Sequence, residues 1–296
     1  MSQIPVQDHH IRFLFEGVSV RGELVQLQHT WEKMQERHAY PKAVKNILGE
    51  ALAATVLLSS TLKFNGNLTF QMQGDGALRL VVVQISHDGY IRGLARWDGE
   101  IPTGGLNKKM GDARIVITIA NQDRKDPYQA IVPVQGKTIS ACLQHYFNSS
   151  VQVPTRLWLG VSDQQVAGML LQRLPDETEY KEMHDEDWNR LCILADTVKQ
   201  EELLALEPPE LLYRLFHEEQ VGIVASEQIT FACSCSSERI ETTIKSLGQA
   251  EVLSIIDEMG SVEVRCEFCN KAYHYSRSDA DRLFDSVSVE ENRTVH

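Results

Sequence analysis

Four cysteines in two tight pairs are the residues of this sequence best suited to chemistry. One residue separates Cys233 from Cys235 and two separate Cys266 from Cys269, with thirty residues between the pairs. Four thiolates have the number and the softness that a tetrahedral zinc site requires. The sequence therefore predicts that Cys233, Cys235, Cys266 and Cys269 bind one Zn²⁺ per chain.

The surroundings of the two pairs differ. CEFCNKAY has the form of a zinc knuckle, and Asn270 suits a left-handed turn that points backbone amides at the sulfurs. The one-residue spacing of the first pair is shorter than structural zinc fingers use, because it strains the turn. A segment this small has little core of its own, so metal loss is expected to unfold residues 232 to about 275.

Such a site also offers redox chemistry. Zinc keeps the sulfurs deprotonated, which is the form that oxidants attack. Nearest neighbours are expected to pair on oxidation, Cys233 with Cys235 and Cys266 with Cys269, and such small loops favour easy reduction. An inert structural site is the alternative, and the cysteines alone leave both readings open.

Other polar residues carry weaker signals. Cys142 and Cys192 lie in apolar helical stretches, where a single cysteine is usually a small core residue. His145 follows Cys142 at helical spacing, but no third group that would orient it is identifiable, so no catalytic residue is predicted. His274 is a less favoured substitute ligand, since four thiols are already present.

Secondary-structure patterns precede the cysteines in the chain. Period-two alternation predicts strands, with Gly17 and Gly22 as bends or bulges in the first of them. Helical periodicity predicts helices, the strongest of which follows Pro41. The strands lie at 11–25, 68–73, 78–86, 90–97, 113–120, 128–134, 155–162 and 165–174, and the helices at 30–38, 42–62 and 138–150. Short sequential strands with tight turns indicate an α+β fold with an antiparallel sheet and packed helices, over residues 1–175.

An acidic segment follows this domain. Residues 176–220 contain fourteen Asp or Glu and four Lys or Arg, and include two amphipathic stretches at 187–198 and 208–216. Isolated helices of this length are marginal in water, so their order depends on docking. We therefore expect residues 176–231 to form a metastable helical linker. The remainder, 232–296, is expected to be a small zinc-binding redox-switch domain with a short helix that begins at Ser278.

Composition excludes some partners. The net charge of −12 and the lack of clustered Lys or Arg argue against nucleic acid. No apolar run reaches the ~18 residues of a membrane span, and MSQIPVQDHH does not look like a signal peptide. A cytoplasmic protein without a membrane partner is expected.

The sequence resembles a known family over nearly its whole length. CSCSSER and CEFC, together with SVRGELV, YPKAVKNILGEALAATVLLSSTLKFNG, LTFQMQGDG, VPTRLWL, GMLLQ and LLYRLFHEEQV, occur in the order found in the redox-regulated heat-shock chaperones of 33 kDa, the 33 kDa chaperonins. Cys233, Cys235, Cys266 and Cys269 occupy the family's cysteine positions.

This resemblance implies a function. The family is one of ATP-independent holdases, which are zinc-bound and inactive when reduced. Oxidation of the four cysteines to two disulfides releases zinc, unfolds the linker, exposes apolar surface for unfolded client proteins, and favours a homodimer. Two alternatives come from the residues alone: a dithiol oxidoreductase that uses CEFC, which would be expected earlier in the chain, and a zinc-ribbon adaptor, which the negative charge disfavours.

Overall fold

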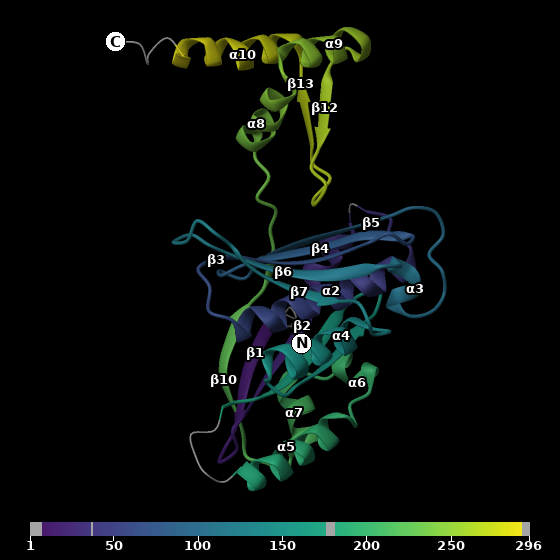
Figure 1. The fold of residues 1–296 in the computed structure, drawn as a ribbon, viewed down its shortest axis with the longest axis vertical. Helices are drawn as coiled ribbons and strands as arrows, with labels where there is room; N and C mark the ends of the chain where they lie inside the picture. The colour runs from purple at the N-terminus through teal and green to yellow at the C-terminus, as the bar shows by residue number, and fades with distance from the viewer. Residues whose placement is uncertain (1–7, 37, 176–180, 292–296) are drawn as a thin grey trace, which may run out of the picture. The chain divides into compact units, whose positions relative to one another are not determined.

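The structure is a computed structural model that describes residues 8–36, 38–175 and 181–291 (Figure 1). The chain forms two compact units, of which the first ends at Ala232 and the second begins at Cys233. Both units combine helices with antiparallel strands, so the predicted α+β class is confirmed.

A six-stranded sheet forms one layer of the first unit. Neighbouring strands of this sheet are antiparallel, except that the two-residue edge strand β11 pairs in parallel with β5. Leu68, Phe70 and Met72 are buried and alternate with more exposed polar residues, as the period-two pattern predicts. The strand order is β11 (Thr230–Phe231), β5 (Tyr90–Trp97), β4 (Leu78–Ser86), β3 (Gly66–Gly74), β6 (Ala113–Asn121) and β7 (Tyr128–Pro133).

A five-stranded antiparallel sheet forms the second layer. Gly17 has φ +73° and turns the chain between the first two strands, as expected. Gly22 is not a bend: it lies within β2, where a Cβ would come within 2.0 Å of the Phe13 ring, so it provides space for packing. The strand order is β10 (Val221–Gln228), β1 (His9–Phe15), β2 (Val20–Leu27), β9 (Val166–Arg173) and β8 (Thr155–Val161).

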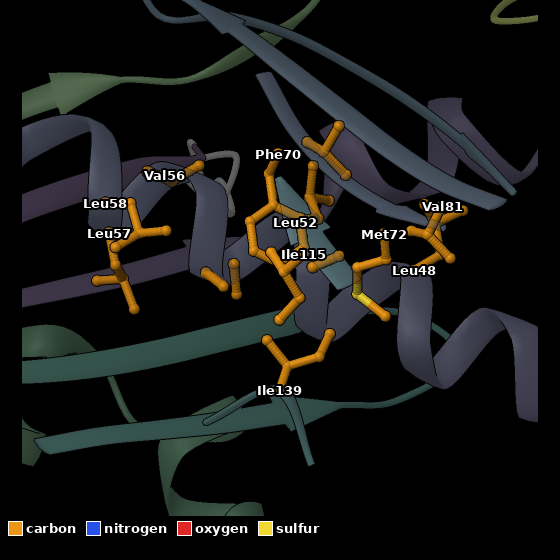
Figure 2. Packing of buried hydrophobic residues seen from close by; sticks show 14 of the residues in the cluster. Leu48, Leu52, Val56, Leu57, Leu58, Phe70, Met72, Val81, Ile115 and Ile139 are labelled. Atoms are coloured by element: carbon orange, nitrogen blue, oxygen red, sulfur yellow. The ribbon is translucent and has the colours of Figure 1, made fainter. Parts of the chain in front are cut away.

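The helix α2 (Lys42–Thr61) is the centre of this unit. It packs against β3, β4 and β5 of one sheet and β2, β8 and β9 of the other. Figure 2 shows Leu48 and Leu52 of α2 among side chains of the six-stranded sheet, including Phe70 and Met72. By length and composition alone this helix could cross a membrane, but 67% of its apolar window is buried inside the protein, as in the core helix of a soluble protein.

Smaller helices complete the first unit around these layers. They contribute Trp31, Leu106 and Ile139 to the same core as α2. They are α1 (His29–Gln35), α3 (Leu106–Met110), α4 (Ile139–Tyr146) and a π-helical turn, η1 (Phe147–Val151).

The acidic segment docks on the outer face of the five-stranded sheet. Its helices are α5 (Lys181–Ala195), α6 (Gln200–Ala205), which the sequence analysis missed, and α7 (Pro208–Phe216). Leu211 and Phe216 pack with Phe13 and Phe15 from β1 in a second apolar cluster. The predicted linker is helical only as far as Phe216, however. Its remaining residues form β10, an edge strand of the five-stranded sheet, and β11, an edge strand of the six-stranded sheet.

The second unit consists of a hairpin and three helices. Its elements are α8 (Ser237–Leu247), α9 (Gln249–Met259), β12 (Val262–Arg265), β13 (Ala272–Tyr275) and α10 (Arg277–Glu291). The last helix begins earlier than predicted, because Ser276 rather than Ser278 caps it: Asp279 N donates to Ser276 Oγ at 3.3 Å and Ser276 N donates to Asp279 Oδ2 at 2.9 Å.

Candidate metal centre

The second unit brings the four paired cysteines together. Cys233 and Cys235 lie in the segment before α8, and Cys266 and Cys269 lie in the turn between β12 and β13. All four Sγ atoms are within 4.8 Å of one another. Cys233 Sγ lies 3.6 Å from Cys266 Sγ, and Cys235 Sγ lies 3.5 Å from Cys269 Sγ.

These distances fit a metal ion. Four sulfurs at ~2.3 Å from a tetrahedral zinc would be about 3.8 Å apart, close to the separations observed. All six cysteines of the chain are thiols in this structure. Both of these separations join one cysteine of the first pair to one of the second, and with all four sulfurs within 4.8 Å, the spacing does not select a disulfide pairing. The group is thus a possible metal site whose metal the geometry does not identify.

Arg239 holds the unusual one-residue link of the first pair. Its Nη1 donates to the carbonyl oxygen of Ser234 at 3.0 Å and to Ser234 Oγ at 2.8 Å. Ser236 then caps α8, because its Oγ accepts from Arg239 N at 3.4 Å. One arginine therefore ties the residue between Cys233 and Cys235 to the first turn of the next helix. The sequence analysis did not find this role, although Arg239 lies within the CSCSSER motif.

The turn of the second pair closes as the sequence predicts. Asn270 has φ +53°, which is the expected left-handed conformation. Its amide donates to the carbonyl oxygen of Cys266 at 2.6 Å, and Cys266 N donates to the carbonyl oxygen of Lys271 at 3.0 Å. These bonds continue the hairpin around Cys266 and Cys269, and so present both sulfurs on one side of the turn.

A tyrosine from the hairpin contacts the first pair. Tyr273 of β13 donates its hydroxyl hydrogen to Cys235 Sγ at 3.2 Å. Burial raises the pKa of Cys235, but the hydrogen bonds from Tyr273 and the other thiols outweigh burial and lower this pKa to about 7. Burial raises the pKa of Cys269 to about 12, and burial also raises that of Cys233. The environment of Cys235 thus favours the thiolate, whereas the environments of Cys233 and Cys269 favour the thiol.

The remaining candidate residues lie apart from this group. The His274 side chain is 61% exposed, with its Nδ1 3.5 Å from Glu263 Oε2, and it is not part of the cluster of candidate ligands. Cys142 is buried in the core and accepts from Gly136 N at 3.4 Å, whereas His145 on the same helix is exposed. Cys192 is also buried, and burial raises its pKa to about 11.

CEFC does not lie where a thioredoxin-like active pair would. That pair needs a strand-to-helix junction in a βαβ unit, where the helix N-terminus lowers the thiol pKa. Here Cys266 and Cys269 lie in the turn of a two-stranded antiparallel hairpin. The arrangement favours metal binding over dithiol exchange as an enzyme activity.

Comparison with known proteins identifies the family of this chain. The family model described as "Hsp33 protein" matches residues 8–276. A 33 kDa chaperonin of Nitrosococcus oceani is 47% identical over 291 residues, which cover 98% of this chain and 99% of that protein. A 33 kDa chaperonin of Shewanella oneidensis is 43% identical over 284 residues, covering 96% and 94%.

A solved structure has the same fold. The crystal structure of the 33 kDa chaperonin (heat shock protein 33 homolog) from Thermotoga maritima matches with a TM-score of 0.81 at 24% identity, over 95% of this chain and 99% of that one. The family model spans most of the sequence, and the relatives align along almost their full lengths. The chain therefore belongs to the Hsp33 family of 33 kDa chaperonins.

Proposed function

We propose that this protein is an ATP-independent holdase that oxidation switches on. In the reduced protein Cys233, Cys235, Cys266 and Cys269 bind one Zn²⁺ and the chaperone is inactive. Oxidation converts the cysteines to two disulfides, Cys233 with Cys235 and Cys266 with Cys269, and zinc is released. The observation that carries the proposal is the convergence of four thiol sulfurs within 4.8 Å in a unit with a small core.

The redox step balances with a peroxide as oxidant. A thiolate sulfur attacks one peroxide oxygen, the O–O bond breaks, and a sulfenic acid and a hydroxide result. The neighbouring thiolate attacks the sulfenic sulfur, forms the S–S bond and displaces a second hydroxide. Each pair gives two electrons to one peroxide, and two protons convert the hydroxides to water. The two pairs together consume two peroxides.

Loss of zinc is expected to unfold the second unit. Among the described residues its apolar cluster contains eight that are buried, including Tyr273, Tyr275 and one residue of β12. Zinc binding contributes on the order of 10 kcal/mol in zinc-finger peptides, which is more than so small a core supplies. We propose that residues 232–296 act as the redox switch on this basis.

The acidic segment is the second part of the proposed switch. Helices α5, α6 and α7 are short and marginal alone, and they are ordered here by apolar side chains on the five-stranded sheet. Their melting would expose residues such as Leu211, Leu215 and Phe216. We propose 1–175 as the core, client-binding and dimerisation domain and 176–231 as the metastable linker, with unfolded or partly unfolded proteins as clients and a homodimer as the oxidised form.

The same chemistry supports a location. Four thiols that must stay reduced until stress arrives require a reducing compartment, and disulfides form and persist in oxidising ones. We therefore propose that the protein works in the cytoplasm, during oxidative and heat stress.

The test follows zinc and client together. Reduced, zinc-loaded protein is titrated with peroxide at raised temperature while a chromophoric chelator reports zinc release and light scattering reports aggregation of an unfolding client. We expect one zinc per chain to leave as two disulfides form, with client protection appearing only then. Zinc that stays bound, or that leaves without a gain in protection, would contradict the proposal. Cys142→Ala is the matched control, because it removes a thiol that lies outside both the cluster and the linker helices.

The linker is tested separately by hydrogen exchange. Oxidation with mild heating is expected to speed exchange in α5, α6 and α7, because helices this short are marginal in water unless they are docked on the sheet. Unchanged exchange in these helices after full oxidation would remove the linker from the switch and leave the cysteine centre alone.

A further inference from the structure

We propose that Tyr273 stabilises the reduced centre by donating a hydrogen bond to the sulfur of Cys235, which strengthens zinc binding and slows attack by peroxide. This inference rests on the proposed function and deepens it. Tyr273 is a positioning residue: it acts through Cys235 rather than on the oxidant.

The geometry places the hydroxyl at this sulfur. Tyr273 is thirty-eight residues from Cys235 in sequence, yet its Oη lies 3.2 Å from Cys235 Sγ. Its ring belongs to the apolar cluster of the second unit and is 8% exposed, so the side chain is held in place. Lys271 Nζ lies 4.9 Å from the ring centroid, and a cation at that distance makes the phenol a stronger hydrogen-bond donor.

The contact falls on a sulfur that water and oxidants can approach. Cys233 and Cys235 are half-buried, whereas Cys266 and Cys269 are buried. Accessible thiolates are the ones that oxidation selects. A donor on Cys235 therefore acts where the centre is most open.

The hydrogen bond from Tyr273 is expected to strengthen metal binding and to slow oxidation of Cys235. A hydrogen bond to a thiolate stabilises its charge, and the nucleophilicity of a thiolate falls as its stabilisation increases. Hydrogen bonds to metal-bound sulfur also tune metal sites, and loss of such an outer contact typically costs 10- to 100-fold in metal affinity. The hydroxyl of Tyr273 thus favours zinc-bound thiolate over the oxidised products.

The chain contains a matched control on the same strand. Tyr275 lies two residues along β13, belongs to the same cluster and is also 8% exposed. Its hydroxyl donates instead to the carbonyl oxygen of Ser237 at 3.5 Å. Tyr275→Phe and Tyr273→Phe both remove one hydroxyl from this core and keep the ring, but only Tyr273→Phe removes a donor from sulfur.

The experiment uses the full chain with three readouts. Zinc affinity is measured by competition with a chelator, zinc release is timed at a fixed peroxide concentration, and the Co²⁺-substituted protein reports the energy of the sulfur-to-metal charge-transfer band. We expect Tyr273→Phe to weaken zinc binding about tenfold. Release should be about threefold faster, because a thiolate that loses a hydrogen bond becomes a better nucleophile. The charge-transfer band should move to longer wavelength, a shift that a purely structural role of the hydroxyl would not cause.

The outcomes separate this inference from the proposed function. Tyr275→Phe should stay within about twofold of wild type in affinity and rate, the scatter expected where no ligand contact changes. If Tyr273→Phe matches Tyr275→Phe in all three readouts, or releases zinc more slowly than wild type, the role of Tyr273 is overturned and the proposed switch stands. A wild-type protein that binds no zinc overturns both.

Discussion

The two units of this protein obtain their stability in different ways. The first unit has two apolar clusters, with 39 and 14 buried residues among those described, arranged on both faces of the five-stranded sheet and around α2. The second has one cluster with 8 buried residues and four thiols beside it. Burial of apolar surface suffices for a core of the first size, whereas the second is too small without a further constraint. In the proposed function, loss of the metal would therefore unfold the second unit and leave the large core around α2 intact.

Removal of zinc is expected to have the largest effect on the difference in stability between the two units. Chelation of the reduced protein is expected to unfold the second unit and leave the core of the first, because metal binding contributes on the order of 10 kcal/mol to such small domains. Hydrogen exchange would show loss of protection in β12 and β13 with α2 unchanged, and zinc addition should restore it. If β12 and β13 stay protected without metal, the second core is sufficient alone and the contrast fails.

A cavity in the large core is expected to destabilise the first unit and to leave the zinc affinity of the second unit unchanged. Leu52 of α2 is fully buried between the two sheets, so Leu52→Ala is expected to cost about 3 to 4 kcal/mol of unfolding free energy in the first unit. Denaturant unfolding measures this change, and chelator competition should show unaltered zinc affinity. Asn46→Ala, at an exposed position of the same helix, is the control. A change in zinc affinity in Leu52→Ala alone would mean that the two units are coupled.

A half-buried carboxyl group on α2 makes the stability of the first unit depend on pH. Burial raises the pKa of Glu50 from 4.5 to about 7. This effect outweighs the charge of Lys109 and a hydrogen bond with the backbone of Ile139, both of which lower the pKa. A raised carboxyl pKa stabilises the fold below the unfolded pKa, and this contribution is lost as pH rises through about 7. Relative to Glu50→Gln, wild type should therefore lose at most about 3 kcal/mol between pH 4.5 and 8. Parallel stability curves for the two proteins would show that Glu50 is well solvated.

The smallest expected effect concerns the link between the first two cysteines. Arg239→Gln removes the two hydrogen bonds to Ser234, and exposed hydrogen bonds of this kind contribute about 1 kcal/mol in total, or about fivefold in zinc affinity. Chelator competition measures it, with Arg282→Gln as control, since Arg282 is equally exposed in the same unit and pairs with Asp279 instead. Equal affinities in the two variants would indicate that the cysteine link holds its shape without Arg239.

Local patterns in the sequence predicted the parts of the fold whose interactions are local. The alternation through Leu68, Phe70 and Met72 marked β3, and the apolar spacing after Pro41 marked α2 almost to the residue. Tight turns were also legible, since Gly17 and Asn270 adopt positive φ as expected. In each case the residue types within a short window decide the backbone conformation.

Less regular stretches were missed for physical reasons. β10 is an edge strand with mostly exposed residues, so it lacks the alternation that identifies a strand, and its pairing with β1 supplies the order. α8 and α9 were also not predicted, although Ile240, Ile244 and Leu247 of α8 recur at helical spacing; few positions in either helix are buried. Gly22 was read as a bend because glycine weakens a strand, whereas the Phe13 ring requires its missing side chain.

The number of thiols, their spacing and the left-handed turn at Asn270 were determined by the sequence alone, because thiol chemistry and turn conformation depend on residues within a few positions. Only the tertiary structure brought Cys233 and Cys235 to Cys266 and Cys269 across thirty residues, placed the hydroxyl of Tyr273 on Cys235, and tied Ser234 to Arg239. It also docked α5, α6 and α7 on the sheet. These contacts join residues far apart or in irregular segments, and they form only when the packing of a whole unit makes them favourable.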